Sequence, residues 1–550
     1  MVQMIKGDRQ KKIFLLSLVF VLQVIIFAPH AGTGFVTDDF IWLDNIVIDG
    51  EVDYLRPLTI TTGFFRPLVS WTFGLQYELH GMNSRPYGWF NLFLHLVNIF
   101  LVYLLLSSVE LCRPYAFWAA ALFGFNTKGA TMAVGWISGR TTLLFACFTL
   151  LSLYLYLNVR QQHRQKKWST KGIFLYFLVG IVYFAALLSK ETAVAVPFFV
   201  FLASLIHQKE KNNGTGSRTF LSSVQRAFLN TVVFLVPLIL YFFLRVSSNA
   251  IVIFNAPEYY RFTLAPLVIL KNLVEYVLRS GMLDFIIIAC LLIMLPFTRG
   301  KTKAVKDIPR LPLIAGTGWF LCFLLPTLFI PTRSDIYIYF PQVGVHLAAL
   351  PIIFYLWEAT DSSKRKKLKQ GIALLLVGIS ILTYIASFVF IASQNGEKGK
   401  KSTAFIQQLI QFTRQIKPGA HTFVIDMEPG QAFSPTRTVS YGFAAILHLY
   451  YPHCCLTGTI IPPDNVTKIK CDENMFNFFF WGNGHLTGPL NCNQLKTVIC
   501  FISPDSSILS SVEEEPKKPR RKRLYRLKKR KMRLKQQNIE KNKMDKNINQ

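Results

Sequence analysis

Charged residues are scarce in this sequence, and acidic residues are the scarcer kind. Only 16% of the 550 residues are charged, with 30 Asp and Glu against 60 Lys and Arg. Soluble domains usually carry nearer a quarter charged residues. Hydrophobic residues make up 52% of the chain and aromatic residues 14%, so the shortage of charge excludes an ordinary soluble protein.

Cysteine is also sparse and unevenly placed. Of nine cysteines, five fall in one late polar region: Cys454, Cys455, Cys471, Cys492 and Cys500. This grouping fits an oxidising, extracytoplasmic compartment in which some of them form disulfides. The odd count leaves at least one without a partner in the chain, and spacing does not give the connectivity. Residues 465–467 (Asn-Val-Thr) form a glycosylation sequon in the same region.

Apolar runs of membrane-spanning length recur along the first 391 residues. They lie near 13–28, 88–108, 115–126, 141–158, 173–188, 192–207, 228–246, 282–297, 311–330, 343–357 and 371–392. Lys/Arg clusters or Pro/Gly/Asn turns bound each run, rather than amphipathic faces. The sequence therefore predicts an α-helical polytopic membrane protein with about eleven transmembrane helices.

Positive charge alternates between successive loops. Loops 160–171, 207–226, 299–310 and 364–369 are rich in Lys and Arg, and the loops between them are not. Such a bias marks the cytoplasmic side. It predicts a cytoplasmic N-terminus and an extracytoplasmic C-terminal region. A signal peptide would resemble the first run, with 28–31 as a cleavage region, but we favour a retained span.

The chain is expected to have three parts. Residues 1–395 form the transmembrane domain, whose first outside loop is about 30–86. Residues 396–505 read as a small extracytoplasmic α/β domain, with expected helices at 403–416 and 439–451 and strands at 421–426 and 497–502. Residues 506–550 form a disordered polybasic tail. Thirteen Lys or Arg between 517 and 535 predict contact with anionic lipid, polymer or nucleic acid.

Two adjacent carboxylates, Asp38 and Asp39, open the first outside loop. Such a pair can hold a divalent cation, Mg²⁺ or Mn²⁺, or one member can accept a proton from an attacking hydroxyl. Repulsion between the two charges favours a raised pKa for one of them. An Asp that caps a solvated helix start is the plainer interpretation.

A polar stripe follows on an otherwise apolar run. Asn91, His95 and Asn98 recur at i, i+4 and i+7, which places them on one helical face. Polar groups at membrane depth are costly unless they face a partner helix or an aqueous cavity. Hydrogen bonding between helices is the plainer interpretation for His95, and substrate binding is the functional one.

The order of several short motifs resembles a known family. The motifs are Asp38-Asp39, Arg66-Pro67-Leu68, Asn91-Leu-x-x-His95-x-x-Asn98, Gly135-Trp-Ile-Ser-Gly139-Arg140, Ser189-Lys190-Glu191-Thr192 and Asp335-Ile-Tyr337-Ile-Tyr339-Phe-Pro341. In this order they resemble the polytopic glycosyltransferases of the C-type fold. The closest pattern is the protein O-mannosyltransferase-like group, related to the transmembrane O-mannosyltransferases with tetratricopeptide repeats. No such repeat follows the last apolar run here.

The resemblance implies a membrane glycosyltransferase with a polyprenyl-phosphate sugar as donor. The acceptor hydroxyl belongs to a protein, lipid or glycan outside the membrane, and transfer inverts the anomeric carbon. Asp38 and Asp39 correspond to the catalytic carboxylates. Residues expected to bind the donor phosphate or substrate are Arg66, His95, Arg140, Lys190, Glu191, Tyr337 and Tyr339, although snorkelling to lipid headgroups would also explain the cations.

The sequence departs from the family pattern at two places. Thr127-Lys128 and Met132 stand where the bacterial relatives have a His-Pro pair and a Glu, so a second acidic residue is missing. Ile336 stands where an Arg usually precedes the Tyr-x-Tyr motif, with Arg333 three residues earlier. A transporter, flippase or polymerase of lipid-linked intermediates is the alternative function, and a non-catalytic scaffold is a third.

Overall fold

The computed structural model describes residues 9–59, 64–163, 170–212, 220–248, 261–294, 308–360, 366–412 and, with gaps, 416–490. The chain divides into two units, residues 1–462 with 474–489 and residues 463–473 with 490–550. All that follows concerns the first unit. The five late cysteines, the sequon, the expected strand at 497–502 and the basic tail lie outside the described residues. The domain boundaries at 395 and 505 stay predictions.

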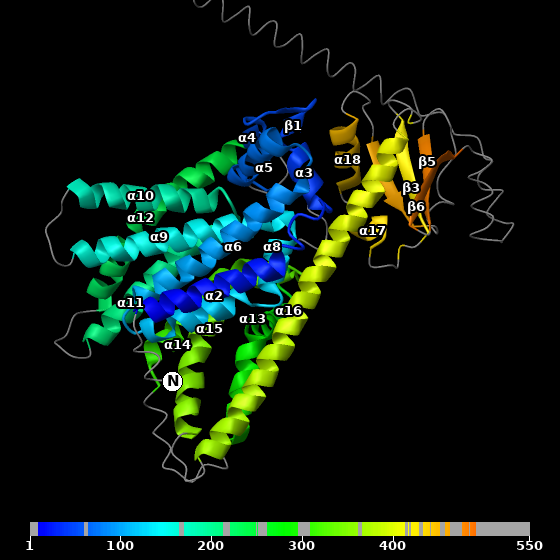
Figure 1. The fold of residues 1–550 in the computed structure, drawn as a ribbon. Helices are drawn as coiled ribbons and strands as arrows, with labels where there is room; N and C mark the ends of the chain where they lie inside the picture. The colour runs from blue at the N-terminus through cyan, green and yellow to red at the C-terminus, as the bar shows by residue number, and fades with distance from the viewer. Residues whose placement is uncertain are drawn as a thin grey trace, which may run out of the picture. The chain divides into compact units, whose positions relative to one another are not determined.

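Long apolar helices make up most of the described chain (Figure 1). They are α2 (Arg9–Phe27), α6 (Ser84–Ser107), α7 (Ala116–Gly124), α9 (Arg140–His163), α10 (Thr170–Leu187), α11 (Ala195–Asn212), α12 (Phe220–Ser247), α13 (Pro266–Met294), α14 (Arg310–Leu328), α15 (Gln342–Thr360) and α16 (Lys366–Gln411). Five helical segments among the described residues are long and apolar enough to cross a membrane by length and composition, and other apolar helices are shorter. A multi-pass membrane protein is thus confirmed, and the number of crossings stays a prediction.

The run expected at 115–126 contains a helix that is too short to cross a membrane. The helix α7 has 9 residues, about 14 Å, which is less than half of a ~30 Å hydrocarbon core. The break has a local cause, because the Asn126 side chain accepts hydrogen bonds from the N–H groups of Lys128 (3.1 Å) and Gly129 (2.7 Å). These bonds start a new helix, α8 (Gly129–Gly135), followed by the 3₁₀ turn η2 (Ile137–Gly139).

The helix α13 begins 16 residues before the apolar run expected at 282–297. Its first half carries Lys271, Glu275 and Arg279, so hydropathy alone does not reveal it. The two halves meet at Gly281, whose backbone is non-helical (φ −118°, ψ 22°). The polar half is stabilised by ion pairs with the turn η7 (Asp335–Ile338), described below.

The segment expected to be the first outside loop is built from short elements. They are α3 (Asp38–Asp44), β1 (Val47–Ile48), β2 (Glu51–Val52), α4 (Arg56–Thr59) and α5 (Pro67–His80). Phe40 and Leu43 on α3 and Phe73 on α5 are fully buried. The acidic pair therefore opens a helix that is packed into the protein.

A four-stranded sheet forms from β3 (His421–Asp426), β4 (Thr457–Ile461), β5 (Phe476–Gly482) and β6 (His485–Leu490), in the order β4-β3-β5-β6. Strand β3 runs parallel to both β4 and β5. Two short helices, α17 (Pro435–Thr438) and α18 (Phe443–Tyr450), lie before β4. The strand expected at 421–426 and the helix expected at 439–451 are present, and β4 to β6 were not expected from the pattern.

The helix α16 reaches from the apolar helices to this sheet without interruption (Figure 1). It has 46 residues, about 69 Å, more than twice the thickness of a hydrocarbon core. Near its end, Phe405 contacts Phe443 of α18 and Trp481 of β5, and Phe412 contacts Phe479. The helix expected at 403–416 is the last part of this one long helix.

Candidate active site

Asp39 is fully buried, and both of its carboxylate oxygens accept hydrogen bonds. One oxygen accepts from the backbone N–H of Ser138 (2.7 Å) and from its hydroxyl, and the other accepts from the N–H of Val36 (2.8 Å). Burial raises the pKa of Asp39 to about 7, against the opposing effect of these hydrogen bonds. Asp39 therefore joins α3 to η2, and each of its carboxylate oxygens is bound by protein donors.

Asp38 has a different environment, although it is the neighbouring residue. Its side chain is partly exposed, and no described residue donates a hydrogen bond to its carboxylate. Burial raises the pKa of Asp38, and the nearby positive charge of Arg66 acts in the opposite direction. Of the acidic pair, Asp38 is thus the carboxylate available for a substrate.

The backbone before Asp38 is held in a strained conformation. Thr37 has φ 44° and ψ −112°, a left-handed region that a β-branched residue rarely adopts. Its N–H donates to the carbonyl of Thr438 (3.0 Å). A Cβ on Gly442 would lie 2.3 Å from the Thr37 carbonyl oxygen. The segment around α17 and α18 therefore fixes the turn that presents Asp38.

Arg66 and Glu191 form a two-pronged ion pair close to Asp38. The Arg66 Nε lies 3.1 Å from each Glu191 carboxylate oxygen, and Nη2 lies 2.8 Å from Oε2. Their side chains are 16% and 25% exposed. Arg66 precedes α5 and Glu191 begins the 3₁₀ turn η3 (Glu191–Val194), so the pair joins the loop before α5 to the turn between α10 and α11. Part of the Arg66 fork stays available for an anion.

Lys190 lies next to this pair in sequence and is largely buried. Its Nζ donates to the Thr142 hydroxyl (2.7 Å) and lies 5.6 Å from the ring centre of Tyr337. Burial and the neighbouring Arg66 charge lower the pKa of Lys190 to about 7. An ammonium has three donors, so two remain for an incoming phosphate. Thr142 was not expected from the sequence, because a lone Thr in an apolar run gives no signal.

Arg140 is enclosed by the protein. Its guanidinium donates to the Asn91 side chain (3.2 Å) and the Tyr87 carbonyl (3.1 Å), and stacks over the ring of Phe73 at 4.4 Å. The side chain has no exposed surface. Arg140 lies two residues after the Ser138 that binds Asp39, in a position suited to holding η2.

His95 and Tyr339 are also fully buried and bind each other. The His95 Nδ1 lies 2.8 Å from the Tyr339 hydroxyl, and Nε2 lies 3.3 Å from the Gly124 carbonyl. Because a carbonyl only accepts, Nε2 carries the proton and Nδ1 accepts from the hydroxyl. Asn98 donates to the same hydroxyl (3.2 Å). These contacts join α6 to the segment before α15.

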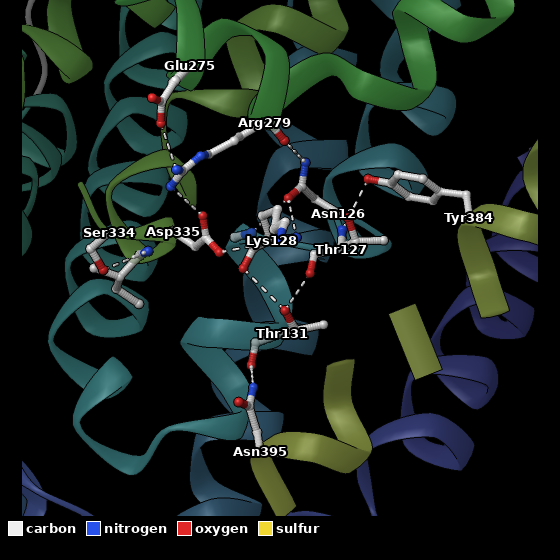
Figure 2. A network of polar contacts seen from close by, with 12 residues as sticks. Asn126, Thr127, Lys128, Thr131, Glu275, Arg279, Ser334, Asp335, Tyr384 and Asn395 are labelled. Atoms are coloured by element: carbon white, nitrogen blue, oxygen red, sulfur yellow. Dashed lines mark hydrogen bonds and ion pairs between the residues drawn. The ribbon is translucent and has the colours of Figure 1, made fainter. Parts of the chain in front are cut away.

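The turn η7 carries a charged network with α13 and the segment before α8 (Figure 2). Asp335 pairs with Arg279 (2.9 Å) and, at 3.9 Å, with Lys128. Glu275 pairs with Arg279 (2.8 Å) and with Arg333. These side chains are 27–42% exposed. The network fixes η7, and with it Tyr337, against α13 and the break before α8.

The same break is tied to α16. Figure 2 shows Tyr384 and Asn395 reaching it from that helix. The Tyr384 hydroxyl accepts from the N–H of Thr127 (3.1 Å), and the Asn395 amide donates to the Thr131 carbonyl (3.2 Å). The sequence pattern did not indicate these partners of the break.

A divalent cation is a poor fit to the acidic pair. Among the described residues, no three His, Cys, Asp or Glu side chains gather as metal ligands. The Asp39 oxygens accept from protein donors, which leaves the Asp38 carboxylate as the contribution of this pair to a cation. We derive no step through a metal.

The fold and the site define a multi-pass membrane protein with acidic and basic side chains in the loops that connect its apolar helices. Part of the sequence is similar to protein O-mannosyl-transferase Tmtc1 of Drosophila melanogaster, 28% identical over 207 residues, 35% of this chain and 23% of that protein. It is also similar to a protein O-mannosyl-transferase of Caenorhabditis elegans, 25% identical over 229 residues, 38% of this chain and 31% of that protein. The O-mannosyltransferase-like resemblance is confirmed, over less than a third of either relative.

No protein-family model matches the chain. Two solved structures are similar in shape at low sequence identity. ArnT from Cupriavidus metallidurans bound to undecaprenyl phosphate has a TM-score of 0.49 and 13% identity, over 86% of this chain and 93% of that one. The Archaeoglobus fulgidus oligosaccharyltransferase has a TM-score of 0.47 and 11% identity, over 82% and 64%.

Proposed function

We propose that the chain is a membrane glycosyltransferase that moves a sugar from a lipid-phosphate donor to a hydroxyl on the extracytoplasmic side, with inversion. The observation that carries the proposal is the difference between two adjacent carboxylates. The Asp39 carboxylate accepts hydrogen bonds from protein donors. The Asp38 carboxylate accepts none from the described residues and lies in the electrostatic field of Arg66. The sequence similarity to protein O-mannosyl-transferases favours transfer to a hydroxyl over transport.

The chemistry requires a base and a cationic site for the leaving group. The acceptor hydroxyl gives its proton to the Asp38 carboxylate as its oxygen attacks the anomeric carbon. The bond from that carbon to the phosphate oxygen breaks, and the lipid phosphate leaves with the electron pair. Attack opposite the leaving group inverts the anomeric carbon. Lys190 and the open part of the Arg66 fork stabilise the phosphate.

The other expected site residues have supporting roles in this proposal. Glu191 orients Arg66, and the ring of Tyr337 lies beside the Lys190 ammonium. Arg140, His95 and Tyr339 act through packing, because their polar groups bind protein atoms and they have no exposed surface. The donor is proposed to be a polyprenyl-phosphate sugar, and the N-terminus to be cytoplasmic with the sheet outside.

The test compares Asp38→Asn and Asp39→Asn, singly and together, in membranes with equal amounts of protein. Release of lipid phosphate is measured together with sugar incorporation. Asp38→Asn should lose roughly 10²- to 10⁴-fold in transfer, the usual value of general-base assistance. Asp44→Asn is the matched control, on the same helix with a carboxylate that faces His448 (3.2 Å). Transfer at the unmodified rate by Asp38→Asn would remove the proposal's chemical support.

A further inference from the structure

A pocket of about 610 Å³ is lined in part by the residues just before Asp38, which we call the acidic loop together with Asp38 and Asp39. Neither Arg66 nor Glu191 lines this pocket. Its walls come from the end of α2, the start of α6, the outer part of α16 and Tyr450 of α18. Thr33 and Phe35, just before Asp38, line it as well. This volume is in the range of binding pockets for small molecules.

The charge of the pocket is positive. Arg85 and Lys400 line it, and the lining includes no acidic residue among those the structure describes. The Arg85 side chain is exposed, and no described group binds its guanidinium. Lys400 is 56% exposed and has one partner, Glu397, at 2.6 Å. The pocket is therefore suited to an anion, with the Arg85 fork free to bind a phosphate.

A second, apolar groove lies further along α6. Trp89 belongs to the pocket, and Phe93, Leu96, Val97 and Phe100 follow on the same helical face. Together with Phe20 of α2, the last four line a groove of about 360 Å³ through apolar side chains alone. Trp89, Phe93 and Phe100 are 46%, 57% and 42% exposed, although large and apolar. Figure 1 shows α2 beside α6.

The order of these features along α6 matches a lipid molecule. In the predicted topology α2 ends, and α6 begins, at the extracytoplasmic surface, so the basic pocket lies at headgroup level and the groove lies deeper. Trp is the residue favoured at that boundary. From Trp89 to Phe100 the helix rises about 16 Å, roughly one leaflet of the hydrocarbon core.

We propose that this pocket and groove bind an anionic phospholipid of the extracytoplasmic leaflet. Its phosphate lies between Arg85 and Lys400, and one acyl chain follows the groove between α2 and α6. Because Thr33 and Phe35 form part of the wall, a bound lipid also supports the loop that presents Asp38. This site is separate from the donor site proposed at Arg66 and Lys190.

The experiment uses the full chain in nanodiscs and photoreactive phospholipids with a diazirine in one acyl chain. A phosphatidylglycerol probe should label peptides covering α2 and residues 89–100. Arg85→Glu with Lys400→Glu should reduce that labelling roughly tenfold or more, since each cation attracts an anionic lipid. Lys398→Glu is the matched control, because Lys398 is exposed, lies two residues from Lys400 and does not line the pocket.

The groove is tested independently of the charges. Val97→Trp should fill it and abolish labelling, whereas Val232→Trp on the exposed face of α12 should not. Gel filtration and thermal unfolding check that each variant is folded. Equal labelling by a phosphatidylcholine probe, or labelling unchanged in the charge-reversed variant, would overturn the proposal. Full competition by soluble glycerol phosphate would also overturn it, by showing an anion site without a lipid chain.

Discussion

Ser138 donates two hydrogen bonds to Asp39, one from its backbone N–H and one from its hydroxyl, across 99 residues of chain. The contact joins the loop after α2 to the turn before α9. It explains how two adjacent aspartates can have unlike roles. Asp39 is bound by Ser138 and fixes the loop, whereas Asp38 is left free to bind a substrate.

Ser138→Ala should therefore lower stability more than it lowers chemistry. It removes one bond to a buried carboxylate and should cost about 1–3 kcal/mol of the free energy of unfolding. Thermal unfolding of the purified chain measures the loss. Thr141→Ala, which removes a hydroxyl bonded to the Ser138 carbonyl at 3.2 Å, is a milder neighbouring control. Unchanged stability in Ser138→Ala would show that the Asp39 contact carries little energy.

The pKa of about 7 for Asp39 predicts a pH-dependent stability. Below pH 4 the carboxyl is protonated in both folded and unfolded chains. Between pH 4 and about 7 the unfolded chain loses the proton first, so the free energy of unfolding should fall as pH rises. Asp39→Asn should flatten this dependence in unfolding curves taken from pH 4 to 8. A slope that persists in the variant would assign it to other groups.

Lys190 predicts the alkaline limit of activity. Its pKa is about 7, so the charge that meets the donor phosphate is lost as pH rises through that value. Lys190→Arg, which stays protonated, should extend donor binding to higher pH even if the best rate is lower. The dependence of KM for the donor on pH is the measurement. An alkaline limb that does not move in this variant would exclude Lys190 as its cause.

The close approach of α16 to the acidic loop requires a glycine at position 399. A Cβ there would lie 2.7 Å from the Thr33 hydroxyl and 2.8 Å from the Gly34 nitrogen. Gly399→Val should displace this loop and reduce transfer at least roughly tenfold, as misplacement of a reacting group does. Gly378→Val is the control on the same helix, where an added Cβ meets nothing within 4 Å. Equal transfer by the two variants would show that this close approach of α16 is not needed for activity.

The topology predicts opposite sides for two segments. Single cysteines placed at Gln161 and at Lys398 should react with a membrane-impermeant reagent from the cytoplasmic and the extracytoplasmic side, respectively. Both positions are exposed. Labelling of the two from the same side would contradict the predicted orientation.

Hydropathy was sufficient for the helices and insufficient for their interruptions. The apolar runs fall on helices because burial in lipid demands long apolar segments. The early start of α13 depends on side-chain partners far away in the chain, such as Asp335 for Arg279. The end of α7 depends on the hydrogen bonds that Asn126 accepts from the next residues. Strands β4 to β6 have only 5, 7 and 6 residues, and the alternation of apolar and polar residues in them is weak.

The candidate site was foreseeable by residue type but not by role. Motif order pointed to Asp38, Arg66, Lys190 and Glu191, and the structure brings Arg66 to Glu191 from loops 125 residues apart. The motifs could not distinguish a charged side chain that is free to bind a ligand from one whose polar atoms are bound by other protein groups. That difference depends on Ser138 for Asp39 and on Asn91 for Arg140, contacts that only a folded chain brings together.

Because α16 is one uninterrupted helix, the number of residues along it decides which side chains face the acidic loop and which face the sheet. Each residue turns an α-helix by about 100° and lengthens it by about 1.5 Å. Gly396, Gly399 and Ser402 recur at three-residue steps against the acidic loop, and Phe405 and Phe412 beyond them face the sheet domain. One residue inserted before Gly396 would therefore rotate the whole outer end of the helix away from the loop. An insertion or a deletion in this stretch of α16 should therefore disturb the loop before Asp38 and the contacts with the sheet together, although each of these residues contacts only the protein.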